Sequence, residues 1–436
     1  MPGMTMNQLR NKTPAILAAL LLCASSARAQ SSAQYNLIAI HFTGLHRYAP
    51  EQAVAASGLR IGSSVAAADV QSAAERLSKS GAFDSVSFQT STRGNELTAQ
   101  FGVTETKDVL PCIFDNFVWF TDTELDRVLR QHVTFYAGEA PVQGDSVAQI
   151  RGALQDLLRT NGIPGEVSEI PYGTLGTVRA LLFHIDGISQ PIKNITFSGQ
   201  AAISDKELTD ASAALTKQDF SITNVETYAS AALLPLYYKR GYLQTQFGRP
   251  KVNLIDASSK GPVTDVSVTL PVVEGNQYSW SGASWSGNQA LSADELAKAL
   301  GMNQREVANQ EKIDAGFANV RKAYLSRGYI NVRIIPTRDL DDAAKLASYS
   351  VRVDEGSQFH MGQVYFDGVP DRGASALLKK WKLKPGDIYD ATYPFDFLQN
   401  TAARELAQVR SSYRTSTVKQ EADSNTSIVN LRIQFH

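Results

Sequence analysis

The sequence predicts an α+β protein of five tandem β-α-α-β-β repeats, each a three-stranded mixed sheet with two helices on one face, together forming an elongated rod. Two landmarks recur along the chain at intervals of about 80 residues. The first is a strand-like opening that ends in a bulky residue, one further residue and a glycine, at Gly44, Gly199, Gly287 and Gly368. The second is an apolar helix that runs into a glycine and an apolar residue, at Gly81, Gly162, Gly241 and Gly328. The first interval between opening glycines is about twice the others, so we expect a divergent copy near Phe117, where the glycine is replaced.

The elements inside one repeat follow from local patterns. A first helix is predicted by a Ser or Thr followed three residues later by Glu, the pattern of a capping box, at Thr121, Ser204 and Ser292. A second helix is predicted by apolar residues that recur about every 3.6 residues, the period of an α-helix, as at Ile313, Phe317, Val320 and Tyr324. Pro235 interrupts this pattern in the third repeat, so we expect that helix to bend or restart there. Two alternating strands complete each repeat, and the closing ones are 97–105, 178–187, 263–275, 346–356 and 428–436.

These patterns predict the boundaries of the chain's parts. Arg10 and Lys12 precede an apolar run at 15–24 and a small-x-small site at Ala27 to Ala29, which is typical of a secretory signal peptide. The apolar run is shorter than the about 20 residues that a membrane-spanning helix needs. We therefore expect a signal peptide at 1–29 and repeats at 30–107, 108–189 (divergent), 190–275, 276–356 and 357–436 (divergent).

Charge and motif content argue against several function classes. With 42 Lys and Arg against 43 Asp and Glu, the chain has no basic excess to neutralise nucleic-acid phosphates. The sequence contains no Gly-x-Ser-x-Gly elbow, no His-Glu-x-x-His pair and no phosphate-binding loop. We therefore predict no nucleic-acid partner, no catalytic residue, no cofactor and no metal site. Asp339, Asp341 and Asp342 are interpreted as a solvated hairpin in preference to a cation site.

Three single residues give further expectations. Cys112 is the lone cysteine of the mature chain and has apolar neighbours, which favours a small buried side chain over an intermolecular disulfide. Trp280 and Trp285 lie on opposite faces of a regular strand. We expect Trp285 in the core and Trp280 outward, as a contact for a neighbouring repeat or a partner.

The first repeat resembles the polypeptide-transport-associated (POTRA) domain, which occurs in barrel-assembly proteins of the BamA type. The resemblance rests on an opening with Ile38, Ile40, Phe42 and Gly44, a Gly58-Leu59-x-x-Gly62 step, and a helix exit with Leu77, Gly81, Phe83 and Val86. It extends over the whole predicted array, less closely in the second and fifth repeats. In the family such an array precedes a membrane β-barrel, whereas this sequence stops at the closing strand of the fifth repeat. We therefore expect the array without a barrel.

The resemblance also suggests where a partner binds. Edge strands carry unpaired backbone donors and acceptors that can accept another strand, which is β-augmentation. In the resembled family the second strand is the exposed edge, which corresponds to 85–90, 166–170, 242–248, 329–335 and 413–420. The partner-binding candidates on these segments are Val86, Phe88, Gln244, Gln246, Asn331, Arg333, Thr415 and Thr417. The alternative is a merely protected surface, which charges such as Arg333, Arg414 and Lys419 would suit.

The resemblance implies a non-enzymatic periplasmic scaffold or chaperone-like binder in outer-membrane protein assembly or polypeptide transport. Its expected partners are unfolded outer-membrane polypeptides or an outer-membrane barrel protein, and it is peripheral to the membrane at most. Two alternatives stay open. One is a structural interaction module in another envelope process, such as division or adhesion, and the other is a partner of a separately encoded barrel.

Overall fold

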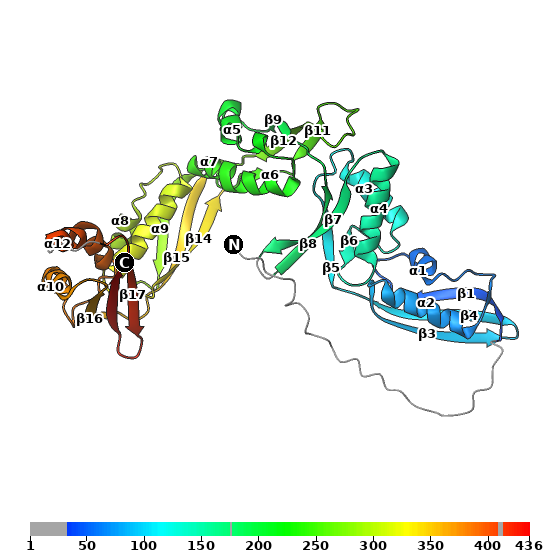
Figure 1. Ribbon diagram of the computed structural model, residues 1–436, viewed down its shortest axis with the longest axis horizontal. Coiled ribbons are helices and arrows are strands. Elements are labelled where there is room, and N and C mark those ends of the chain that lie inside the picture. The colour runs from blue at the N-terminus through cyan, green and yellow to red at the C-terminus, as the bar shows by residue number, and fades with distance from the viewer. Residues whose placement is uncertain (1–32, 175–176, 409–412) are drawn as a thin grey trace, which may run out of the picture. The chain divides into compact units, whose positions relative to one another are not determined.

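The computed structural model describes residues 33–174, 177–408 and 413–436, so the predicted signal peptide lies outside the described residues. The chain separates into two compact units. One contains the described residues up to Pro111 together with Val128–Ile150, and the other contains Cys112–Arg127 and Arg151–His436. Helices and small mixed sheets occur in both units, which confirms the predicted α+β class (Figure 1). The predicted domain boundaries stay a prediction.

The first sheet has the strand order β2-β1-β4-β3. β1 (Tyr35–Thr43) runs parallel to β4 (Glu96–Glu105), and β3 (Phe83–Arg93) is antiparallel to β4. Helices α1 (Pro50–Ser57) and α2 (Ala67–Lys79) belong to the same unit. The short strand β2 (Ser64–Val65) pairs with β1, so the expectation of three strands is wrong for this sheet.

The second sheet has the order β6-β5-β8-β7 and likewise has four strands. Residues 109–111 of β5 pair with β6, and residues 112–114 pair in parallel with β8. The elements of this part of the chain are β5 (Val109–Phe114), α3 (Asp122–His132), β6 (Glu139–Pro141), α4 (Ser146–Thr160), β7 (Glu166–Thr174) and β8 (Thr177–Asp186).

In the third sheet, β12 pairs in parallel with β9 and antiparallel with both β10 and β11. The long second helix is interrupted, because α6 is followed by a π-helical turn at Ala229–Leu233 before α7 begins with Pro235 in its first turn. A new α-helical segment therefore starts next to Pro235, where a bend or restart was predicted. The bounds are β9 (Ile192–Ser198), α5 (Asp205–Ala211), α6 (Ile222–Tyr228), α7 (Leu234–Lys239), β10 (Gln246–Phe247), β11 (Lys251–Leu254) and β12 (Val266–Val273).

The last two sheets have three strands each, in the orders β13-β15-β14 and β16-β18-β17. In both, the first and last strands in sequence run parallel and the middle strand is antiparallel to the last. Asp339 and Asp341 lie on β14, and Asp342 lies in the turn to β15, as the hairpin interpretation predicted. The bounds are β13 (Ser279–Ser286), α8 (Ala293–Leu300), α9 (Gln310–Leu325), β14 (Arg333–Asp341), β15 (Leu346–Asp354), β16 (His360–Asp367), α10 (Asp371–Lys380), α11 (Tyr393–Phe397), α12 (Ala403–Gln408), β17 (Ser416–Asp423) and β18 (Ile428–Phe435).

The opening glycines share one structural role. Each has a positive φ, between 78° and 89°, directly after the opening strand. A Cβ at any of them would lie 2.0 to 2.3 Å from a backbone carbonyl oxygen of the closing strand. No side chain fits that contact, so the chain requires glycine at these turns. The positions are Gly44, Gly199, Gly287 and Gly368.

The tryptophan prediction is half wrong, and a β-bulge explains why. Trp280 is buried in the core of the fourth sheet, and Trp285 is half-buried against the same core. The register with β15 shifts between Trp280 and Gly282, so one extra residue resets the alternation and turns both side chains toward one face. The same shift occurs near the start of β1, β9 and β16.

Two smaller expectations need correction. The capping boxes at Thr121 and Ser292 form with both of their hydrogen bonds. At Ser204 only one of the two bonds forms, because the Ser204 hydroxyl accepts from the Glu207 amide but the Glu207 carboxylate binds Arg240, with both oxygen-to-nitrogen distances at 2.8 Å. Cys112 on β5 is half-buried, not fully buried.

Within the described residues, no helix has both the length and the apolar content needed to cross a membrane. In the same part of the chain, no three His, Cys, Asp or Glu side chains gather in a group that could hold a metal ion.

Candidate partner-binding site

Five segments at the sheet edges are the candidate site. β3, β7, β14 and β17 each end their sheet's strand order, with a neighbouring strand on one side. In the third sheet β10 and β11 share this position, separated by Gly248, Arg249 and Pro250. The backbone of such a strand has donors and acceptors directed away from the sheet.

The structure places most, but not all, of the candidate residues on these strands. Val86 and Phe88 lie on β3, Gln246 on β10, Arg333 on β14 and Thr417 on β17. Thr415 directly precedes β17 and exchanges backbone hydrogen bonds with His436, at 2.9 and 3.3 Å. Gln244 and Asn331 lie in turns before their strands, so their placement on an edge strand was wrong. The turns arise because the glycine-aromatic helix exit takes several residues to reach the sheet.

β3 is the edge best suited to accept a strand. Its residues 85–92 contain neither a charged side chain nor a proline. Val86 packs against the core of the first sheet, and Phe88 is 39% exposed with its ring centroid 6.4 Å from that of Phe101. Val86 and Phe88 therefore form an apolar border beside an uncharged backbone edge.

The other edges carry features that discourage pairing. β7 contains Pro171 and β14 contains Pro336, and proline on an edge strand removes a donor on the solvent side. β14 also carries Arg333 in an ion pair with Asp354 at 3.2 Å, and β17 carries Lys419 paired with Glu421 at 3.1 Å. Charges on an edge oppose the addition of an apolar strand.

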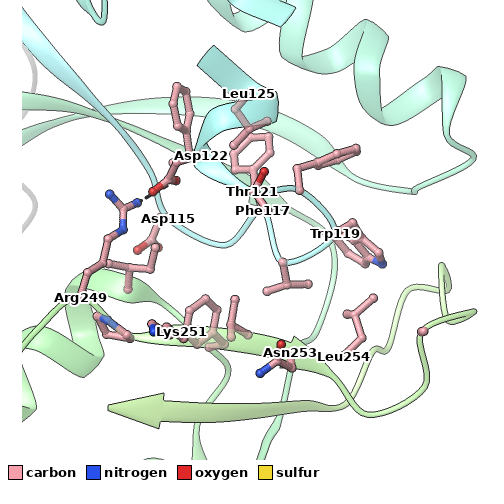
Figure 2. Close-up of a pocket in the computed structure, with 18 residues that line it drawn as sticks. Asp115, Phe117, Trp119, Thr121, Asp122, Leu125, Arg249, Lys251, Asn253 and Leu254 are labelled. Atoms are coloured by element: carbon pink, nitrogen blue, oxygen red, sulfur yellow. Dashed lines mark hydrogen bonds and ion pairs between the residues drawn. The ribbon is translucent and has the colours of Figure 1, made fainter. Parts of the chain in front are cut away.

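Sequence reasoning missed a pocket beside β11. It has a volume of about 500 Å³ and lies between the segment 114–125 and residues of the third sheet (Figure 2). Trp119 Nε1 donates to the Ser259 carbonyl at 2.8 Å, and Arg249 pairs with Asp122 at 3.1 Å. The segments that line the pocket are about 130 residues apart in the sequence. The aromatic residues from Phe117 to Phe120 were the feature of the sequence that could have indicated it.

The deep side of this pocket holds a buried polar network. Asp115 is 2% exposed. One oxygen of its carboxylate, Oδ1, accepts hydrogen bonds from Ser221 Oγ at 2.9 Å, from the Thr223 amide at 3.1 Å and from Thr223 Oγ1 at 3.2 Å. Its other oxygen accepts from His184 Nδ1 at 3.0 Å. Burial alone raises the pKa of Asp115, but the bonds from His184, Thr223 and Ser221 outweigh burial and hold the pKa below its ordinary 3.8.

This network predicts a pH dependence of stability. The hydrogen bond to Asp115 raises the pKa of His184 above its ordinary 6.5, against the opposing effect of burial, and Asp186 lies 3.9 Å from the other ring nitrogen. A raised folded-state pKa gives stability that is complete below pH 6.5 and is lost as the pH rises through the folded-state pKa. We expect about 1 kcal/mol to be lost over that window, the difference between a charged and a neutral hydrogen bond.

Urea unfolding of the wild type and of His184→Gln, at pH values from 6 to 9, measures this loss. The variant should lack the decline seen in the wild type. An identical decline in both proteins would assign it to other groups.

The family model "POTRA: Surface antigen variable number repeat" matches residues 190–275 and 278–356. A "Putative outer membrane protein assembly factor" of Treponema pallidum is 26% identical over 220 residues, 49% of this chain and 26% of that protein. The "Outer membrane protein assembly factor BamA" of Neisseria meningitidis is 26% identical over 174 residues, 37% of this chain and 21% of that protein. The chain thus spans about a quarter of the length of these relatives.

Among solved structures, a crystal structure of Haemophilus influenzae BamA POTRA3-5 shares 20% identity, with a TM-score of 0.40. The match covers 57% of this chain and 96% of that one. The POTRA resemblance inferred from the sequence is confirmed, and the chain carries tandem POTRA domains in its segments 190–275 and 278–356.

Proposed function

We propose that this chain is a non-enzymatic periplasmic binder in outer-membrane protein assembly. Support comes from the tandem POTRA matches and from relatives whose names describe outer-membrane assembly factors. The proposal includes five POTRA-like repeats with the boundaries given above and export of the chain to the periplasm. The partners are unfolded outer-membrane polypeptides or an outer-membrane barrel protein.

The proposed mode of binding is β-augmentation at the edge strand β3. The observation that carries it is the stretch 85–92 of β3, which is at a sheet edge and has no charge and no proline, whereas the other edges have one or both or are interrupted. A client strand would take its backbone hydrogen bonds from β3. Its apolar side chains would pack beside Val86 and Phe88.

This mode suits clients that share a pattern and not a sequence. Strands that end up in the outer membrane alternate apolar and polar residues over about ten positions. Backbone hydrogen bonds between strands do not depend on which side chains the strands carry. The apolar border beside the added strand favours a strand in which apolar and polar side chains alternate. One edge can therefore bind many different clients.

A charge placed on the β3 edge tests the proposal. We expect Phe88→Lys to weaken binding of a peptide of about ten residues with alternating apolar and polar side chains by about fivefold, because it puts an ammonium group against the incoming strand. Affinity is measured by fluorescence anisotropy of the labelled peptide on the full chain.

Leu378→Lys is the matched control. Leu378 is 52% exposed on helix α10, so this variant also replaces an exposed apolar side chain by lysine, away from any strand edge. Its affinity should equal that of the wild type. Equal weakening in both variants, or none in Phe88→Lys, would contradict binding at β3.

A further inference from the structure

The pocket beside β11 has an apolar interior and a polar rim. All of its lining residues belong to the second compact unit. The buried and half-buried lining side chains are mostly apolar, and they include Phe117, Val118, Trp119, Phe220 and Leu254. The exposed ones are mostly polar, namely Thr121, Asp122, Arg249, Lys251 and Asn253. Its volume of about 500 Å³ lies within the range of about 300 to 1,000 Å³ for ligand pockets, which combine an apolar lining with a few polar groups.

Contacts within the chain position the walls of this pocket. Trp119 Nε1 donates to the Ser259 carbonyl at 2.8 Å, so the indole uses its one polar group there and offers apolar surface to the pocket. Arg249 pairs with Asp122 at 3.1 Å across the rim (Figure 2). Val118 packs in the core cluster of the third sheet. The two segments that line the pocket are therefore fixed by interactions that need no ligand.

The charges around the pocket leave one cation without a partner. The Arg249 guanidinium is paired with Asp122, and the Asp115 carboxylate on the deep side is occupied by buried hydrogen-bond donors. Lys251 is exposed at the rim and makes no ion pair with any residue in the part of the chain that the structure describes. A ligand whose apolar part enters the interior therefore meets a free ammonium group at the rim.

We propose that this pocket binds a small single-chain amphiphile with a carboxylate head, such as a fatty-acid anion. The alkyl chain lies against Phe117 and Trp119, and the carboxylate lies at the rim beside Lys251. The alkyl chain supplies most of the affinity, because each buried CH₂ group strengthens binding about fourfold. The ion pair is exposed, so it contributes less and sets the orientation of the ligand. The inference goes beyond the proposed function, because it assigns a small-molecule site to residues that binding at β3 does not use.

Decanoate and octanoate, each below the concentration at which it forms micelles, test the apolar part of the site. Binding to the full chain is followed by tryptophan fluorescence. Trp119→Phe identifies the signal of the pocket, because the other tryptophans, Trp280, Trp285 and Trp381, do not line it. We expect a saturable change that is absent in Trp119→Phe. Decanoate should bind about 15-fold more tightly than octanoate, because it buries two more CH₂ groups.

Lys251→Gln tests the head group. We expect this variant to bind decanoate about threefold more weakly than the wild type, because the exposed ion pair is lost. Its affinity for decan-1-ol, which has an alkyl chain of the same length and no charge, should be unchanged. Lys260→Gln is the matched control, since Lys260 is also exposed and nearby in the sequence but does not line the pocket. It should bind both compounds as the wild type does.

Three results would overturn the proposal. A fluorescence change that rises without saturation, or that persists in Trp119→Phe, would exclude binding in this pocket. Equal affinities for octanoate and decanoate would exclude an alkyl chain in the interior. Equal decanoate affinities in the wild type and Lys251→Gln would exclude the carboxylate beside Lys251. Peptide binding at residues 85–92 is measured separately, so failure of this proposal is distinguishable from failure of the proposed function.

Discussion

Asp115→Ala is expected to lower the free energy of unfolding of the part of the chain around the third sheet by about 3 to 5 kcal/mol. The Asp115 carboxylate is buried and is the shared acceptor for His184, Ser221 and Thr223. Its removal leaves several buried donors without a partner, each of which costs the free energy of its lost hydration. Urea unfolding measures the loss, and faster exchange of the Thr223 amide proton locates it.

Asp122→Ala is the control for this prediction. Asp122 lies on the same segment and pairs with Arg249, but both side chains are about half exposed. An exposed ion pair contributes about 0 to 1 kcal/mol, so this variant should unfold almost like the wild type. Equal losses in the two variants would contradict the view that the buried network holds these segments together.

Gly44→Ala is expected to destabilise the first sheet by about 2 to 5 kcal/mol. Gly44 has φ 89°, and a Cβ there would lie 2.0 Å from the Val103 carbonyl oxygen. The variant therefore combines left-handed backbone strain with a contact that forces β1 and β4 apart. Amide exchange along β1 and β4 in the full chain measures the effect on this sheet alone.

Gly62→Ala separates the two costs. Gly62 has φ 87°, but a Cβ there would meet no atom within 4 Å. This variant should lose only the cost of the left-handed backbone, about 1 to 2 kcal/mol. A loss as large as that of Gly44→Ala would show that backbone strain, and not the close approach of the strands, makes the opening glycine necessary.

The opening glycines show why the repeat could be predicted from the sequence. At each of these turns the carbonyl oxygen of the closing strand lies too close for any side chain, so the backbone alone requires glycine. Glycine therefore recurs in the sequence at the equivalent turns, at Gly44, Gly199, Gly287 and Gly368. Pro235 is a similar case, because proline lacks the amide that a continuous helix needs and is tolerated in a first turn, which is where α7 has it.

Other features depend on contacts that local patterns do not contain. Trp280 was placed outward because alternation assumes a regular strand, and a single bulge before Gly282 reverses it. Gln244 and Asn331 were placed on strands because the sequence does not show where the turn after the helix ends. The pocket beside β11 requires two distant segments to meet, so neither segment could predict it.

The central claim is that β3 accepts a client strand, and amide hydrogen exchange along β3 is its most direct test. The full chain is compared with and without the alternating peptide at saturating concentration. We predict slower exchange at amides within residues 85–92, because the outward-facing donors of an edge strand become hydrogen-bonded to the added strand. Unchanged exchange in this stretch while the peptide is bound would contradict the claim.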